Sequence, residues 1–239
     1  MTASAAGSSA AITTVGLDAD DTLWHCEPHF KLIEARFAEL VSAHGDVDEV
    51  NEHLLAVERH NLEVFGYGVK GFVLSMIETA IQLTDGAVPT DDIATIIDWG
   101  REMFAHPIEL LPGVAETVER LARSYEVVVM TKGDLFHQES KVAASGLAEH
   151  LSGVEVFAEK DSATYRRVLD RRGIAADSFV MVGNSVASDV LPVLEVGGRA
   201  IHIPYDTNWA LDHADGDGDG YVEIERFDLL PGALATFAT

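Results

Sequence analysis

The amino-acid sequence predicts an α/β protein: a doubly wound parallel sheet with an inserted all-helical subdomain. After residue 110, short apolar segments rich in β-branched residues alternate with amphipathic helical segments, as in parallel sheets. Between residues 28 and 106 the apolar residues recur at helical spacing and no strand signal interrupts them. We therefore expect a core domain of residues 1–27 and 107–239, interrupted by a helical subdomain of residues 28–106.

The strands are predicted from apolar runs that are short and dominated by β-branched residues. Val127–Val129 followed by Met130 and Thr131 is the clearest, because such a run is typical of a strand buried on both faces. The expected strands are residues 12–17, 127–131, 154–158, 179–182 and 200–203, with a further edge strand at 221–224.

Four helices are expected in the inserted subdomain. Pro28 suits the first turn of a helix, a second helix covers 47–65, and a third carries apolar residues from Phe72 to Ile81. The fourth begins near Thr90, a favourable N-cap. Its apolar residues, Ile97 among them, are expected to face inward.

In the core domain, helices are expected between the strands. One covers 114–121, and Asp134 caps another that stops at Gly146. Ser162 is expected to cap a helix that ends at Gly173, and a last helix to span 185–196.

Composition and charge exclude several classes of protein. The chain has 239 residues and is 47% hydrophobic, which is enough for a sizeable core and argues against disorder. Forty acidic against sixteen basic residues give a net charge of −24, which repels nucleic acid and anionic membrane surfaces. Cys26 is the single cysteine, so a disulfide scaffold is excluded. With neither a membrane-length apolar run nor a secretory signal, we expect a cytoplasmic protein that binds neither nucleic acid nor membrane.

Polar and charged residues follow the predicted strands at the point where each strand ends. In a doubly wound sheet these ends meet at one edge, where the ligand site lies. Carboxylates, a hydroxyl group and lysines are therefore expected to converge there. These residues are Asp18, Asp20, Thr131, Lys132, Lys160, Asn184, Ser185 and Asp189.

Four segments among them form an ordered set of motifs. LDADDTLW at 17–24 has the form Asp-x-Asp-x-Thr, and VVVMTKG at 127–133 is a strand that ends in Thr. EK at 159–160 supplies a lysine, and VGNSVASDV at 182–190 supplies an acidic residue after a glycine. In this order the set resembles the haloacid dehalogenase superfamily, most of whose members are phosphatases. The resemblance covers nearly the whole chain and implies that the helical insertion is a cap over the site.

The resemblance also implies roles for individual residues. Asp18 is the expected nucleophile, and Asp20 the expected general acid and base. Mg²⁺ is the expected cofactor, with the Asp18 carboxylate, the Asp20 backbone carbonyl and an Asn184 or Asp189 oxygen as ligands. The remaining site residues are Thr131 as the donor to a phosphoryl oxygen, Lys160 as the partner of Asp18, and Lys132 as a substrate-binding residue.

One position departs from the family pattern. The fourth motif usually reads Gly-Asp, whereas this chain has Gly183-Asn184, which removes one formal charge from the metal site. The true haloacid dehalogenases need no metal and also carry Asn in this region, but they lack the second Asp of the first motif. Asp20 therefore favours a phosphatase acting on a small phosphorylated metabolite. The alternatives are a 2-haloacid dehalogenase and a catalytically weak binding or regulatory protein.

Two further segments are less specific. Lys70, in the glycine-rich turn at 66–71, is either an exposed lysine or a contact to an anionic substrate. The acidic segment 215–220 resembles the start of an EF-hand loop, but Arg226 stands where that loop needs Glu. We expect an acidic loop there.

Overall fold

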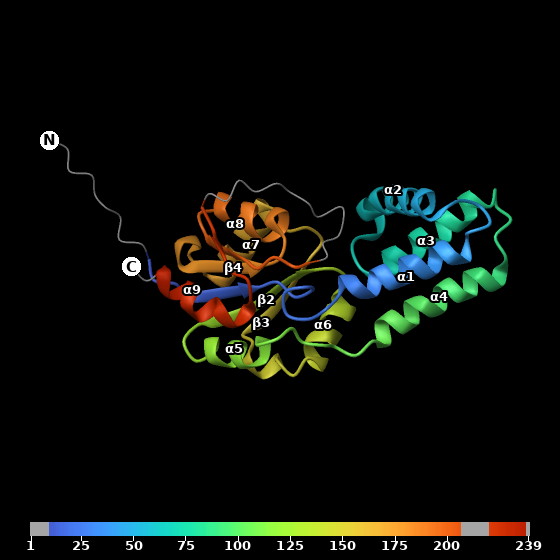
Figure 1. The fold of residues 1–239 in the computed structure, drawn as a ribbon. Helices are drawn as coiled ribbons and strands as arrows, with labels where there is room; N and C mark the ends of the chain where they lie inside the picture. Colours follow the sequence, from blue (N-terminus) through green and yellow to red (C-terminus); the bar gives the residue numbers. More distant parts are fainter. Residues whose placement is uncertain (1–9, 207–219, 238–239) are drawn as a thin grey trace.

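The computed structural model describes residues 10–206 and 220–237. A sheet with helices on both faces forms one half of the molecule, and the four helices α1–α4 form the other half (Figure 1). The N-terminal segment before residue 10 and most of the acidic segment 215–220 lie outside the described residues. The expectations for those two segments therefore stay predictions.

Six parallel strands form the sheet, in the order β3-β2-β1-β4-β5-β6. The predicted parallel sheet is confirmed, and each strand lies within two residues of its expected range. The strand order turns at β1, which pairs with β2 on one side and β4 on the other. A crevice at the carboxyl end of β1 is the expected place for a ligand site. The strands are β1 (Thr14–Leu17), β2 (Glu126–Lys132), β3 (Gly153–Phe157), β4 (Phe179–Gly183), β5 (Arg199–His202) and β6 (Val222–Glu223).

Successive side chains of β2 pack on opposite faces of the sheet, as the period of two in a strand requires. Val127 and Val129 belong to the apolar cluster on one face, and Val128 and Met130 to the cluster on the other. Both faces are covered, and this is why the sequence of β2 is apolar without alternation.

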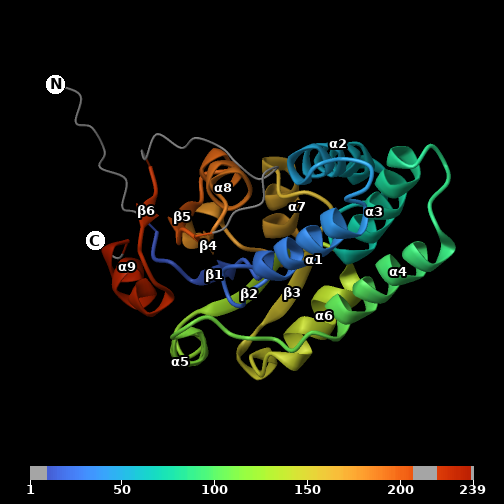
Figure 2. The ribbon, with the colours of Figure 1, turned by 45° about the vertical axis from the view of Figure 1, so that its right-hand side comes forward.

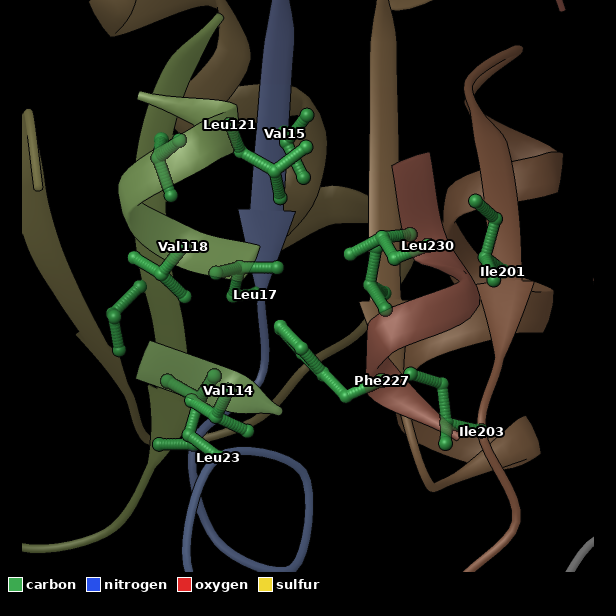
Figure 3. Close-up of a cluster of buried hydrophobic side chains, with 14 of the residues drawn as sticks. Val15, Leu17, Leu23, Val114, Val118, Leu121, Ile201, Ile203, Phe227 and Leu230 are labelled. Atoms are coloured by element: carbon green, nitrogen blue, oxygen red, sulfur yellow. The ribbon is translucent and has the colours of Figure 1, made fainter. Parts of the chain in front are cut away.

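Helices α5, α6 and α9 cover one face of the sheet, and α7 and α8 cover the other. On the first face, Val15 and Leu17 of β1 meet Val118 and Leu121 of α5, with Leu230 of α9 beside Ile201 (Figure 3). The helices of the core are α5 (Val114–Leu121), α6 (Leu135–Ala144), α7 (Ser162–Arg172), α8 (Leu191–Glu195) and α9 (Leu230–Thr236). The short helical turns are η1 (Ala148–His150), η2 (Ala176–Ser178), η3 (Val186–Val190) and η4 (Phe227–Leu229).

The helical cap has an apolar core of its own. Its helices are α1 (Glu27–Leu40), α2 (Val47–Phe65), α3 (Val69–Leu83) and α4 (Thr90–Ala105), and they lie together at one end of the sheet (Figure 2). Phe37, Leu54, Met76 and Ile96, one from each helix, are almost completely buried in this cluster. The four helices therefore stabilise one another through this shared core, independently of their contacts with the sheet.

The two connections between cap and core pair with each other. The His25 N–H donates to the Glu109 carbonyl and the Leu111 N–H to the Leu23 carbonyl. The start of α1 is capped from a distance, because the Asp21 carboxylate accepts from the backbone N–H groups of Cys26 and Glu27. The segment that carries the first motif therefore also fixes the direction in which the cap leaves the sheet.

Three local predictions were wrong. Ile97 is 38% exposed, because the inward face of α4 runs through Ile96, Trp99 and Met103. The cap of α7 is Asp161, whose carboxylate accepts from the Thr164 N–H, so Ser162 lies inside the helix. Thr90 likewise lies inside α4, and the residue before that helix is Pro89.

The segment expected as one helix at 185–196 is two. It opens with a π-helical turn, η3, and continues as α8. The wide turn brings the Asp189 carboxylate back to the Ser185 N–H at 3.1 Å. A Cβ at Gly183 would lie 2.1 Å from an Asp189 oxygen, so only glycine fits before this turn. This irregular turn gives Asp189 its place at the end of β4.

Candidate functional site

The carboxyl ends of the strands and the cap line a cavity of about 170 Å³. Nearly all the residues that the sequence singles out line it, although they come from four strand ends. Those that line it are Asp18, Asp20, Thr131, Lys132, Lys160, Asn184, Ser185 and Asp189. Lys70 is the exception: it does not line the cavity, although its neighbours Val69 and Gly71 do.

Lys160 lies between two buried carboxylates. Its Nζ atom is 2.5 Å from Asp18 Oδ1 and 2.6 Å from Asp189 Oδ1. All three residues are less than 10% exposed. Burial by itself would lower the pKa of Lys160, but Asp18 and Asp189 raise it above the ordinary lysine value, so the ammonium stays charged. Lys160 therefore fixes the position of one Asp18 oxygen and compensates its charge.

The other Asp18 oxygen faces Asn184 across a shared hydroxyl. Thr22 Oγ1 lies 3.0 Å from Asp18 Oδ2 and 3.3 Å from Asn184 Oδ1. Two hard oxygens, one charged and one neutral, thus lie within hydrogen-bond distance of the same Thr22 hydroxyl, just after the end of β1. Thr22 was not predicted as a site residue, although it is the Thr of the first motif.

The oxygen donors at this site fit Mg²⁺, although they carry less negative charge than a set of three carboxylates would supply. Asp18 Oδ2 and the Asn184 amide oxygen are the converging donors, and the Asp20 backbone carbonyl is the third that the resemblance implies. Both Asp189 oxygens already accept hydrogen bonds, from Lys160 and from the Ser185 N–H. Within 10–206 and 220–237, no three His, Cys, Asp or Glu side chains form a metal-binding group.

Asp20 is surrounded by donors that the sequence did not predict. Its carboxylate accepts from Trp24 Nε1 at 2.6 Å, from Gln138 Nε2 at 2.8 Å and from Lys141 Nζ at 2.8 Å. Burial would raise the pKa of Asp20, but the Lys141 charge and these hydrogen bonds lower it below the ordinary aspartate value. In this conformation Asp20 is an ionised carboxylate held by α6.

Gln138 and Lys141 could have been found from the sequence by one signal. They lie three residues apart on α6, on a helix face that is buried and polar, with His137 beside them. Polar residues on the inward face of a helix that follows a motif strand mark a site. A lysine on a helix is usually interpreted as solvent-exposed, and for this reason Lys141 was not predicted as a site residue.

Thr131 and Lys132 lie at the end of β2. The Thr131 side chain is almost fully buried and its hydroxyl is 3.2 Å from the Lys132 carbonyl. Lys132 Nζ donates to Ser188 Oγ at 2.9 Å and lies 4.3 Å from the centre of the Tyr67 ring. Since Tyr67 belongs to the turn before α3, Lys132 joins the core to the cap.

A second contact between cap and core involves Lys70. Its Nζ atom is 2.7 Å from Asp134 Oδ2, and its side chain is 58% exposed. Lys70 is not among the residues that line the cavity. Its expected contact with substrate stays a prediction, and in this conformation the ammonium group pairs with the core.

Replacing Lys70 by glutamine is expected to change kcat/KM by less than about threefold, because an exposed ion pair contributes little. The measurement is steady-state kinetics on a substrate that the protein hydrolyses. A rise in KM of tenfold or more, at unchanged kcat, would instead place Lys70 on the substrate.

The chain resembles known proteins over most of its length. The family model for haloacid dehalogenase-like hydrolases matches residues 12–197. The chain belongs to this family of hydrolases. The motifs at 17–24, 127–133, 159–160 and 182–190, which define the cavity, all lie inside the matched region.

Solved structures extend the comparison. A haloacid dehalogenase-like family hydrolase from Xanthomonas campestris is 44% identical with a TM-score of 0.86, over 95% of this chain and 92% of that one. A 2-haloacid dehalogenase from Pseudomonas syringae is 24% identical with a TM-score of 0.63, over 95% and 100%. A predicted phosphoglycolate phosphatase from Haemophilus somnus is 17% identical with a TM-score of 0.62, over 92% and 97%. The last two show the fold alone, and one is described as a dehalogenase and the other as a predicted phosphatase.

No curated protein sequence matches the chain. None of the helices in the described part of the chain has the length and apolar character needed to cross a membrane.

Proposed function

We propose that this hydrolase is a Mg²⁺-dependent phosphatase that acts on a small phosphorylated metabolite through an aspartyl-phosphate intermediate. The observation that carries the proposal is a pair of carboxylates, Asp18 and Asp20, at the end of one strand, each with its own buried lysine. Lys160 holds Asp18 as an ionised nucleophile, and Lys141 holds the Asp20 carboxylate two residues further on, where it can carry a proton to and from the reacting groups.

In the first step Asp18 attacks phosphorus. A bond forms between an Asp18 oxygen and phosphorus, and the bond from phosphorus to the leaving oxygen breaks. Lys160 keeps the Asp18 carboxylate in position, and its charge offsets part of the negative charge of the transition state. The leaving alkoxide takes a proton from Asp20. In the second step Asp20 takes a proton from water, which displaces Asp18 from phosphorus.

The acid step requires a change at Asp20. A carboxylate that accepts from Trp24, Gln138 and Lys141 is not in the form that can give a proton. A phosphate dianion near Lys141 competes for the ammonium and raises the pKa of Asp20 by repulsion. Substrate binding is thus expected to release Asp20 from Lys141 and to protonate it.

The phosphoryl oxygens are assigned to the Thr131 hydroxyl and the Lys132 ammonium, both of which line the cavity. Asp18, Asn184 and the Asp20 backbone carbonyl are the groups that would bind Mg²⁺, with Asp189 held by Lys160 behind them. The bound ion supplies charge neutralisation between the nucleophile and the phosphate dianion.

A dehalogenase is the second candidate, and Asn184 is the observation that favours it. A neutral amide at this position suits a site without metal, and dehalogenases share the fold. The carbon–halogen bond would then break without a proton donor, leaving Asp20 without a catalytic role.

One experiment separates these functions from a catalytically weak binding protein. Release of p-nitrophenol from p-nitrophenyl phosphate is measured with Mg²⁺ and with excess EDTA, beside halide release from 2-chloropropionate. We expect Mg²⁺-dependent p-nitrophenol release and no halide. Halide release in EDTA would support the dehalogenase, and neither product would support the binding protein.

The change Asn184→Asp is expected to tighten Mg²⁺ by roughly five- to thirty-fold, because a carboxylate adds a full charge to a partly dehydrated site. The side chains are nearly isosteric, so the fold is expected to survive. The measurement is the Mg²⁺ concentration for half-maximal initial rate in both proteins at fixed ionic strength. Equal values would mean that residue 184 does not contact the ion.

A further inference from the structure

The two ends of the cavity differ in the cations that they supply. At the strand ends three ammonium groups, from Lys132, Lys141 and Lys160, line it together with the carboxylates of Asp18, Asp20, Asp21, Asp134 and Asp189. Apart from Cys26 and the Tyr67 phenol, the ionisable side chains that the cap helices and their connections contribute are Glu27 and Glu58, from α1 and α2. Phosphate complements the lysine end. The other end is formed by Glu27, Glu58, Asn61 and Ser75, and we call it the cap wall. A different chemical group of the ligand must complement it.

Glu27 is buried without a hydrogen bond to one of its oxygens. The residue is 7% exposed, and no described residue donates to Oε1. Its nearest cation is Lys31, with Nζ 3.5 Å from that oxygen, and Lys31 is 44% exposed and bound more closely by Glu34 at 2.8 Å. Burial raises the pKa of the Glu27 carboxyl to about 7, against the opposing effect of Lys31. A buried carboxylate with an empty acceptor site is costly unless a cation or donor reaches it.

Glu58 faces the same region with still less compensation. Within the described residues it has neither a hydrogen bond nor an ion pair, and its charged neighbours are Glu34, Glu27 and Lys31. Burial raises the pKa of Glu58 to about 8, and the two neighbouring glutamates act in the same direction. Two carboxyl groups on different helices therefore face one cavity, and Lys31, the cation near them, is half exposed and bound more closely by Glu34.

The remaining polar groups of the cap wall offer acceptors as well. Asn61 is buried, and its amide N–H groups donate to Ser75 Oγ at 3.2 Å and to Glu78 Oε2 at 2.9 Å. The Ser75 hydroxyl donates to the Gly71 carbonyl at 2.9 Å. The Asn61 carbonyl oxygen and the two carboxyl groups remain for a ligand. A primary ammonium, with three donors and one positive charge, complements such a surface.

Resting on the proposed phosphatase activity, we propose that the cap wall binds an ammonium group on the leaving-group side, so that the substrates are small phosphate monoesters of amino alcohols. The phosphate lies at the lysine end and the amine at the glutamate end, and each charge of the substrate meets its opposite. A neutral polyol would leave Glu58 without an ion pair and Glu27 with only the partly exposed Lys31. The cavity, at about 170 Å³, is below the volume of typical drug-sized sites, which suits a short amino alcohol.

The test compares two esters of equal length, O-phosphoethanolamine and 2-hydroxyethyl phosphate, which differ by an ammonium in place of a hydroxyl. We expect the wild type to prefer the amine by roughly 30-fold in kcat/KM, the size of effect found for buried charge pairs. Glu58→Gln, which keeps the shape and removes the charge, is expected to reduce this ratio to below about threefold. Glu63→Gln is the matched control, because Glu63 is exposed on the same helix and does not line the cavity. Its ratio is expected to equal that of the wild type.

The two proposals fail in different ways. If the enzyme hydrolyses p-nitrophenyl phosphate but treats the two esters alike, or if Glu58→Gln leaves the ratio unchanged, the amine site is wrong and the phosphatase stands. If no ester is hydrolysed, the phosphatase is wrong. Calorimetric titration of wild type and Glu58→Gln with O-phosphoethanolamine then tests the amine site alone. Weaker binding by the variant supports the site, and equal or absent binding overturns it.

Discussion

Replacing Asp18 by asparagine is expected to lower kcat by at least about 10³-fold, equivalent to about 4 kcal/mol of transition-state stabilisation. The amide keeps the shape, and its one oxygen can accept from Lys160 while its NH2 group can donate to the Thr22 hydroxyl, but it cannot attack phosphorus. No other carboxylate replaces it, because Asp20 is held by α6 and Asp189 by Lys160 and the Ser185 N–H. The measurement is kcat with saturating substrate and Mg²⁺, with the intact mass checked so that deamidation does not restore Asp18.

A second experiment tests the covalent mechanism directly. Beryllium fluoride with Mg²⁺ is expected to form an adduct on Asp18 of the wild type and on no residue of Asp18→Asn. A variant that keeps a tenth of the wild-type rate would contradict the covalent mechanism, whether the substrate is a phosphate ester or a haloacid.

The sheet could be predicted because its central strands, β1, β2 and β4, are buried on both faces. For this reason the sequence of β2 is a run of β-branched residues. Once the strands are placed, the parallel topology brings their carboxyl ends to one edge of the sheet. The residues that meet there are Asp18, Thr131, Lys160 and Asn184. Local rules also predicted the Asp134 cap of α6, whose carboxylate accepts from the His137 N–H. In each of these features, the property that decides the structure is contained in a few neighbouring residues.

Features that depend on distant parts of the chain were missed. The partner of Asp20 is Lys141, 121 residues away, and it is bound because α6 turns a polar face inward. Asp21, with a left-handed backbone (φ 62°), accepts from the first backbone N–H groups of α1, and no local pattern predicted this contact. The acidic cap wall likewise arises from α1 and α2 packing together, and neither helix shows it alone.

Replacing Lys160 by methionine is expected to have the largest effect on stability. Methionine fills similar space but leaves Asp18 and Asp189 buried, at 7% and 1% exposure, without their shared cation. Removing one partner of a buried charge group costs about 3–5 kcal/mol. For a chain of this size the melting temperature is expected to fall by roughly 10 °C. Phosphatase activity is expected to fall as well, because Asp18 loses the group that positions it.

The double variant Lys160→Met/Asp189→Asn separates the two effects. It removes one of the uncompensated charges, so it is expected to recover part of the lost melting temperature and none of the lost kcat. The measurements are thermal unfolding followed by circular dichroism and kcat at a temperature where both proteins are folded. A single variant that melts with the wild type, or a double variant less stable than the single one, would show that Lys160 does not neutralise the two carboxylates. A double variant that regains activity would show instead that Lys160 acts on kcat only by preserving the fold.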